Sequence, residues 1–272
     1  MARVNYDDYL RSERMPHIWC PGCGHGIVLK AIIRAIDKEG WNKDDIVMVS
    51  GIGCYGRMPG YLDANTLHTT HGRPLAFATG VKLANPKLKV IVVTGDGDGI
   101  AIGGNHLIHA ARRNLDITCI LLNNYIYGMT GGQCSPATPV GGLATTTPYG
   151  NSEHPFDIAG VVAAAGGNFV ARSTVYHAVE LENVVHRALT KRGFSFVEAI
   201  TPCPTAYGRR NKLKNALAMM HDIKNRTVSV AKAHGLTDDE KESKIVLGIL
   251  LDRNRIEYTD LYSELVNRVR EV

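Results

Sequence analysis

Apolar positions follow two alternating patterns along most of the chain. One pattern repeats every three or four residues, as in amphipathic helices, and the other is a short continuous apolar run, as in buried strands. The first pattern predicts helices at residues 26–39, 73–86, 103–114, 156–167 and 175–193. The second predicts strands at residues 45–54, 89–98, 117–124, 168–174 and 194–204. This alternation is typical of a doubly wound, mainly parallel α/β sheet.

Three segments fall outside the alternation. Residues 1–19 are expected to form an extended arm. Residues 125–155 are rich in Gly, Thr and Pro and follow a strand, at the edge where open α/β sheets bind ligands, so a functional loop is favoured. We expect one domain over residues 1–212 and a helical C-terminal extension over 213–272 that packs on the core or on a partner subunit.

Composition narrows the class of protein. Of 272 residues, 44% are hydrophobic and 21% are charged, as expected for a globular domain. No apolar run approaches the roughly 18 residues needed to span a bilayer, and the N-terminus lacks a signal-like apolar segment, so a cytoplasmic location is expected. The net charge of +5 is mild, and its basic residues are not interleaved with aromatics, which argues against nucleic-acid binding.

Two polar side chains follow neighbouring apolar runs. Asp96 and Asn124 each stand at the carboxyl end of a predicted strand, and such ends share one edge of a parallel sheet. A carboxylate and a carboxamide suit Mg²⁺, while Gly95 and Gly97 would let a diphosphate approach the backbone. The alternative is a glycine turn followed by an unrelated asparagine turn. A dinucleotide site fits less well, because the stretch GDGDGIAIGG lacks the GxGxxG spacing and the ribose-binding acid.

Six cysteines in a chain without a signal are expected to be free thiols or ligands. Four of them lie in a C-x-x-C loop or near strand ends and could close one site for Zn²⁺ or a [4Fe–4S] cluster: Cys20, Cys23, Cys54 and Cys203. Spacing alone does not separate these two possibilities. Cys119 is expected in the core, and Cys134 lies in the functional loop.

The segment that begins GDG at Gly95 and ends with Asn123-Asn124 resembles the thiamine diphosphate motif. In that motif the aspartate, the second asparagine and a main-chain carbonyl two residues further on hold Mg²⁺ on the diphosphate of the cofactor. The resemblance therefore implies that Asp96, Asn124 and the carbonyl of Ile126 are the Mg²⁺ ligands.

A longer series of motifs over residues 15–215 resembles the β subunit of 2-oxoacid:ferredoxin oxidoreductases. In order these are CPGCGH, GIGC, LHTTHGR, GDGD, NNYIYGMTGGQ and PCPT. The resemblance implies a thiamine diphosphate-binding domain over residues 1–212 with an N-terminal cluster-binding arm, and a [4Fe–4S] cluster on the four cysteines. It also implies an α subunit, further small subunits in some members, coenzyme A as co-substrate and ferredoxin as electron acceptor.

The resemblance also implies roles for residues around the cofactor. Cofactor binding is expected of Gly53, Cys54, His71, Gly72, Arg73, Gly95, Asp96, Gly97, Asp98, Asn124, Ile126, Tyr127, Gly128, Met129 and Thr130. Substrate binding or catalysis is expected of His68, His71, Arg57, Thr130 and Gln133. For Arg57 the alternative is a plain surface ion pair, and for a histidine it is a structural role.

The stretch NNYIYGMTGGQCSPATP is most similar to the 2-oxoglutarate branch, and the 2-oxoisovalerate branch shares much of it. Some related enzymes carry a lysine at the position of Gly131, so the preferred acid stays open. Two rivals remain: a non-catalytic zinc protein on a degenerate thiamine fold, and, less well supported, a thiamine-dependent lyase.

Two further expectations concern partners. The chain shows no candidate for the carboxylate that activates the cofactor, which an α subunit donates in this family, so the chain alone should be inactive. A basic run after Cys203 is either a solvated helix start or a docking site for an acidic ferredoxin or the phosphates of coenzyme A: Arg209, Arg210, Lys212 and Lys214.

Overall fold

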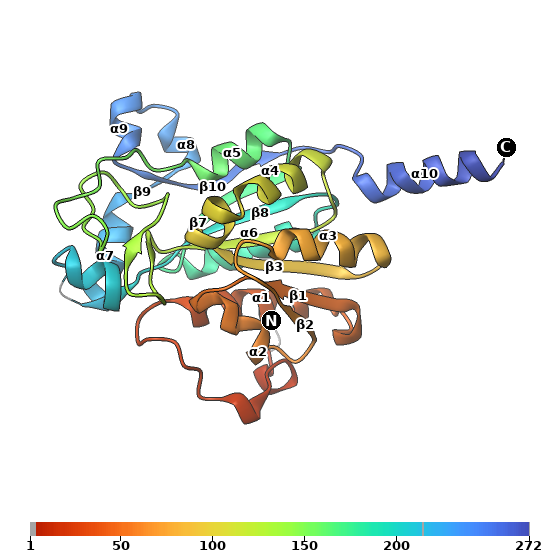
Figure 1. Ribbon diagram of the computed structural model, residues 1–272, viewed down its shortest axis with the longest axis horizontal. Helices are drawn as coiled ribbons and strands as arrows, with labels where there is room; N and C mark the ends of the chain where they lie inside the picture. The colour runs from red at the N-terminus through yellow and green to blue at the C-terminus, as the bar shows by residue number, and fades with distance from the viewer. Residues whose placement is uncertain (1–3, 214, 272) are drawn as a thin grey trace.

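A single eight-stranded sheet forms the centre of the computed structural model, which describes residues 4–213 and 215–271 (Figure 1). Across the sheet the order is β2-β1-β3-β4-β8-β7-β10-β9. The strands are β1 (Ile46–Ser50), β2 (Asn65–His68), β3 (Lys89–Gly95), β4 (Thr118–Asn123), β7 (Phe169–Thr174), β8 (Ser195–Ile200), β9 (Thr227–Ser229) and β10 (Ile245–Asp252). All pairs are parallel except β10 with β7, which confirms the expected mainly parallel sheet.

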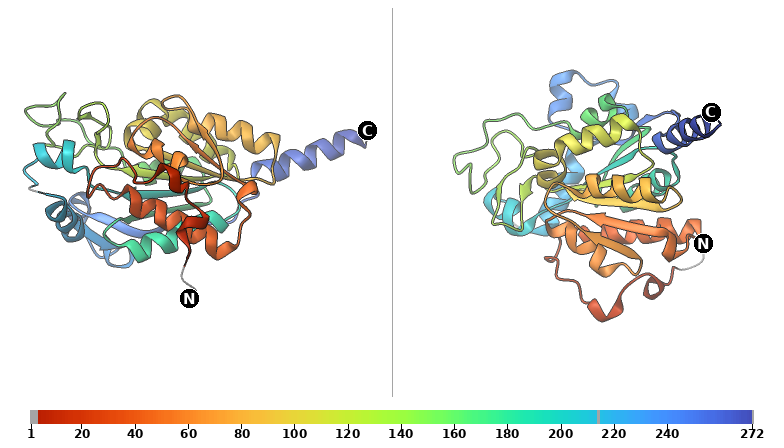
Figure 2. Two further views of the ribbon diagram at one scale, coloured as in Figure 1. Left: turned by 90° about the horizontal axis from the view of Figure 1, so that it is seen from below. Right: turned by 45° about the vertical axis from the view of Figure 1, so that its right-hand side comes forward.

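Helices cover both faces of the sheet, as Figures 1 and 2 show. On one face lie α1 (His25–Glu39) and α6 (Ala178–Thr190), and on the other α3 (Pro74–Ala84), α4 (Gly104–Arg113) and α5 (Ile158–Ala165). Because each face is covered, all six residues of β4 are buried, and its sequence is a continuous apolar run up to its terminal asparagine. These helices agree with the sequence-based prediction to within a few residues at each end.

Four neighbouring parallel strands end at the same edge of the sheet. They are β1, β3, β4 and β8, which are adjacent in that order. The segments that follow them begin at residues 51, 96, 124 and 201. The strand expected over residues 89–98 ends at Gly95, and a π-helical turn, Gly97–Ile102, leads into α4, so helical backbone begins immediately after Asp96.

The C-terminal segment differs from the helical extension expected over residues 213–272. It contains α7 (Ala216–Arg226), α8 (Val230–Ala233), α9 (Asp238–Glu242) and α10 (Tyr258–Arg270), but also β9 and β10. The apolar run of β10 pairs antiparallel with β7, so this part of the prediction is wrong: the segment completes the main sheet. The boundary at residue 212 stays a prediction. In Figure 1, α10 projects away from the body.

The described part of the N-terminal arm, from residue 4 onward, packs against other segments of the same chain. Arg11 donates from its backbone N–H to the carbonyl of Tyr61 in the short helix α2 (Met58–Tyr61), and Tyr9 hydrogen-bonds Asp37 of α1 over 2.9 Å. Trp19 is buried and donates its indole N–H to the carbonyl of Cys54 over 2.7 Å. None of the helices within residues 4–213 and 215–271 is long and apolar enough to cross a bilayer.

Candidate functional site

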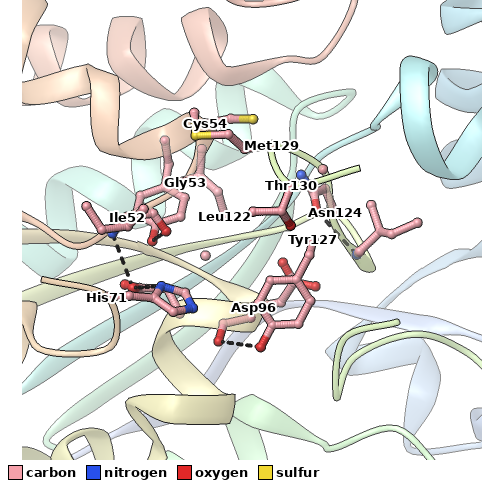
Figure 3. Close-up of a pocket in the computed structure, with 16 residues that line it drawn as sticks. Ile52, Gly53, Cys54, His71, Asp96, Leu122, Asn124, Tyr127, Met129 and Thr130 are labelled. Carbon is pink, nitrogen blue, oxygen red and sulfur yellow. Dashed lines mark hydrogen bonds and ion pairs between the residues drawn. The ribbon is translucent and has the colours of Figure 1, made fainter. Parts of the chain in front are cut away.

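A cavity of about 210 Å³ opens at the carboxyl edge of the sheet, where the segments after β1, β3 and β4 meet (Figure 3). Its walls are Ile52, Gly53, Cys54, Tyr55, His71, Gly95, Asp96, Gly97, Asp98, Leu122, Asn124, Ile126, Tyr127, Gly128, Met129 and Thr130. Of the residues expected to bind the cofactor, all except Gly72 and Arg73 line this cavity. The cavity is also lined by three residues that were not expected there: Ile52, Tyr55 and Leu122. Leu122 belongs to an apolar strand and the other two follow one, so the sequence pattern indicated only core packing for them.

Several residues expected at the site stand outside the cavity wall. Arg57 is exposed at the start of α2, and His68 is exposed at the end of β2, where its Nδ1 lies 2.9 Å from the Ser50 hydroxyl. Arg73 donates to the backbone carbonyls of Gly72 and Ile102. Their roles toward substrate or cofactor stay predictions.

Gln133 does not line the cavity either. It lies in a small hairpin formed by β5 (Ile126–Tyr127) and β6 (Gln133–Cys134). The Thr130 hydroxyl donates to Gln133 Oε1 over 2.6 Å, and the Gln133 amide donates to the Thr130 carbonyl over 2.9 Å. Gln133 therefore shapes the turn that carries Thr130 into the cavity, and its expected part in substrate binding stays a prediction.

Asp96 is a buried carboxylate that has no cationic partner among the described residues. It is 3% exposed, and burial raises the pKa of its carboxyl to about 7, although hydrogen bonds from Ser135 and from backbone N–H groups act in the opposite direction. A buried charge is stable only when it is paired or bound to a metal. Asn124, 8% exposed, lines the same cavity, so the two proposed Mg²⁺ ligands from β3 and β4 do converge.

Ser135 is a further residue of this site that the sequence did not reveal. Its hydroxyl donates to Asp96 Oδ2 over 2.5 Å, and its backbone N–H donates to Thr138, whose hydroxyl in turn donates to the carbonyl of Tyr125. The loop over residues 125–155 is thus anchored to the candidate metal ligand. A serine in an aperiodic loop carries no pattern that would single it out.

The glycines of the GDG segment are required because two tyrosine rings pack directly on the backbone. A methyl group at Gly95 would lie 2.5 Å from the Tyr55 ring, and one at Gly97 would lie 2.3 Å from the Tyr127 ring. The Tyr127 hydroxyl also donates to the Gly97 carbonyl over 3.0 Å. The two glycines therefore make room for the tyrosine rings that line the cavity, and their expected contact with a diphosphate stays a prediction.

The four cysteines expected to act together come from three separate segments that meet beside Gly128. A methyl group built on Gly128 would lie 3.2 Å from Cys203 Sγ and 4.0 Å from Cys54 Sγ. The Thr205 hydroxyl lies 3.8 Å from Cys20 Sγ and 3.9 Å from Cys203 Sγ, so one side chain contacts both sulfurs.

Burial and, after it, the neighbouring thiols of Cys203, Cys20 and Cys23 together raise the pKa of the Cys54 thiol to about 11. A thiol surrounded by three others in this way ionises readily only when metal is bound. Within residues 4–213 and 215–271, no three His, Cys, Asp or Glu side chains are already gathered around one point for a single metal ion. Cys119 is fully buried in β4, as expected.

Comparison with known proteins agrees with this geometry. The family model "Thiamine pyrophosphate enzyme, C-terminal TPP binding domain" matches residues 51–199, the span that carries the cavity. The chain is 52% identical to the 2-oxoglutarate synthase subunit KorB of Methanothermobacter marburgensis, over 94% of this chain and 90% of that one. The chain belongs to the β subunits of the 2-oxoacid:ferredoxin oxidoreductase family.

Two other proteins of the family are similar to this chain over almost its full length. The KorB subunit of Methanocaldococcus jannaschii is 46% identical, over 96% of this chain and 97% of its own length. The solved 2-oxoglutarate:ferredoxin oxidoreductase of Magnetococcus marinus, with 2-oxoglutarate, coenzyme A and succinyl-CoA bound, superposes with a TM-score of 0.88 at 31% identity, covering 99% of this chain and 92% of that one. The family is one of thiamine diphosphate-binding oxidoreductase subunits, so the chain is part of a multi-subunit enzyme.

The buried Asp96 carboxylate should destabilise the folded state of the cofactor-free chain at a pH where the carboxylate is ionised. Its pKa rises from about 3.8 to about 7 on folding, so the folded state loses stability as the pH rises through this window. We expect Asp96→Asn to raise the free energy of unfolding at pH 8 by up to about 4 kcal/mol, and by less at pH 5. Urea unfolding at both pH values measures this difference.

In the same chain Mg²⁺ with thiamine diphosphate should raise the melting temperature of the native protein but not of Asp96→Asn. An equal gain in stability at pH 5 and pH 8 would contradict the burial argument, and an equal ligand-induced shift in both proteins would contradict the assignment of Asp96 as a metal ligand.

Proposed function

We propose that this chain is the thiamine diphosphate- and cluster-binding half of a 2-oxoglutarate:ferredoxin oxidoreductase. The reaction converts 2-oxoglutarate and coenzyme A to succinyl-CoA and CO₂ while two ferredoxins are reduced, or runs in reverse. The observation that carries the proposal is that one edge of the sheet brings Asp96 and Asn124 into the same cavity wall as Cys54, which belongs to the group of four thiols.

The residues described above fit both Mg²⁺ with thiamine diphosphate and a [4Fe–4S] cluster. Asp96, Asn124 and the Ile126 carbonyl would hold Mg²⁺ on the diphosphate, and the buried charge of Asp96 is the feature that a cation would compensate. The four thiols of Cys20, Cys23, Cys54 and Cys203 would hold the [4Fe–4S] cluster. When bound, thiamine diphosphate supplies the carbanion chemistry of decarboxylation and the cluster accepts the electrons singly.

The chain's own side chains position the reactants and exclude water. Ile52, Leu122 and Met129 give the cavity an apolar wall, which strengthens polar interactions inside it. The Thr130 hydroxyl, held by Gln133, is the neutral hydrogen-bonding group at the rim. Arg57 lies beyond the wall, three residues after Cys54, and is our candidate for a substrate carboxylate.

A second subunit would complete the site. Asp96 and Asp98 are the acidic side chains among the described residues of the cavity wall, and Asp98 is fully engaged by protein donors. Neither is free to activate the aminopyrimidine ring of the cofactor, so an α subunit is proposed to supply that carboxylate.

The assembled enzyme should therefore oxidise 2-oxoglutarate only when both subunits are present. We expect coenzyme A-dependent reduction of a viologen dye by the chain with its α subunit, and none by the purified chain alone. The value of kcat/KM for 2-oxoglutarate should exceed that for 2-oxoisovalerate at least about tenfold. Turnover by the single chain would refute an active site shared between two subunits. A preference for 2-oxoisovalerate would show that the substrates are branched-chain 2-oxoacids instead of 2-oxoglutarate.

The thiol group should bind iron and sulfide. We expect the native enzyme, purified without air, to be brown, and Cys54→Ser or Cys203→Ser to lose the visible absorption and most of the iron, because each variant removes one thiolate ligand. Cys134→Ser is the matched control, since this half-buried cysteine lies outside the group, and it should keep its iron. A colourless native protein containing zinc would support the non-catalytic alternative instead.

Arg209 and Arg210 are proposed to receive an acidic ferredoxin. Both line a second cavity with Gly128 and Thr205, beside the thiol group, whereas Lys214 of the same basic run lies outside the described residues. Charge attraction mainly accelerates association and weakens with salt. Replacing both arginines with glutamate should slow ferredoxin reduction and flatten its salt dependence, while the rate with a viologen stays unchanged. An unchanged salt dependence would refute the docking site and favour a plain solvated surface.

A further inference from the structure

Asp98 stands two residues after Asp96, but its carboxylate is saturated by donors. Oδ1 accepts hydrogen bonds from the Gly72 backbone N–H over 2.6 Å, from the His71 ring Nδ1 over 2.8 Å and from the Ile52 N–H over 3.3 Å. Oδ2 accepts from the Thr94 hydroxyl over 2.6 Å. The side chain is fully buried, so Asp98 joins the segments after β1 and β2 to β3 and does not face a ligand.

His71 is the single basic side chain among the described residues that line the cavity. Its Nδ1 is occupied by Asp98, and its ring packs edge-on against Tyr127 with centroids 6.1 Å apart. The ring is 36% exposed, so Nε2 is the nitrogen left for a ligand. Asp96 and a diphosphate would both bring negative charge to this cavity, and one Mg²⁺ does not balance them.

We propose that Asp98 is a positioning residue, which holds the His71 ring so that Nε2–H is donated to an anionic oxygen of the cofactor's diphosphate. In this arrangement both ring N–H groups are used as donors, Nδ1–H to Asp98 and Nε2–H to the diphosphate. The proposal rests on the proposed function for its ligand. The same donor could instead serve the carboxylate of a 2-oxoacid, and the experiment separates these two sources.

The test is a double-mutant cycle in the assembled enzyme, with the dissociation constant of thiamine diphosphate and Mg²⁺ measured by calorimetry. Asp98→Asn keeps the shape and the acceptor but removes the charge, and His71→Gln removes the ring. A hydrogen bond to a charged group corresponds to roughly ten- to hundredfold in binding, so each variant should weaken cofactor binding at least about tenfold. The double variant should be no more than about twofold weaker than His71→Gln, because Asp98 acts through His71.

The KM for 2-oxoglutarate at saturating cofactor should change less than about twofold in each variant. A rise in KM with an unchanged cofactor dissociation constant would assign His71 to the substrate and overturn the proposal. Multiplicative effects in the double variant would show that Asp98 is only a scaffold, and would also overturn it.

Two further variants keep the test independent of folding. Thr94→Val removes a donor from the other oxygen of Asp98 and should lower the melting temperature without weakening cofactor binding. Gly51→Ala would place a methyl group 2.2 Å from Asp98 Oδ2, so it should displace the carboxylate and weaken cofactor binding in the native background but not with His71→Gln. The opposite result for either variant counts against the proposal. Calorimetry needs no turnover, so an enzyme that binds the cofactor but leaves 2-oxoglutarate unchanged would refute the proposed function alone.

Discussion

The parallel pairing of β1, β3, β4 and β8 is the constraint on which the site depends. Parallel strands expose all their carboxyl ends at one edge, and these four are adjacent, so the residues that follow them must lie close together. Cys54, Asp96, Asn124 and Cys203 each come shortly after one of these ends. The chemistry of the chain is therefore concentrated by topology, without any segment having to reach across the molecule.

The same edge places two identical side chains in different hydrogen-bonding environments. Asp96 receives one hydroxyl and backbone donors, and its pKa rises, whereas Asp98 receives donors on both oxygens from three segments. An acid with unsatisfied charge suits a cation, and a satisfied acid suits a structural junction. The short motif GDGD thus contains one ligand candidate and one residue that organises the cavity around it.

Sequence reasoning recovered most of the sheet and the cavity because both depend on regular patterns. Continuous apolar runs located the strands, and polar residues after those runs located Asp96 and Asn124. It missed β10, where an apolar run lies among charged helical segments far from its partner β7. Ser135 could not be found, since its contact with Asp96 depends on the path of an aperiodic loop. Arg57, His68 and Gln133 fit motifs, but whether such residues line the cavity depends on the irregular turns that carry them.

The antiparallel pairing of β10 with β7 also bears on how the chain is made. Until Ile245–Asp252 leaves the ribosome, the edge of β7 that faces away from β8 has unpaired backbone donors and acceptors. Such edges recruit strands from other molecules, and they are hazardous in a nascent protein. β10 therefore joins the sheet late, after the strands that carry the site. A chain that terminated before β10 would contain every candidate ligand and would still expose β7 as an aggregation-prone edge.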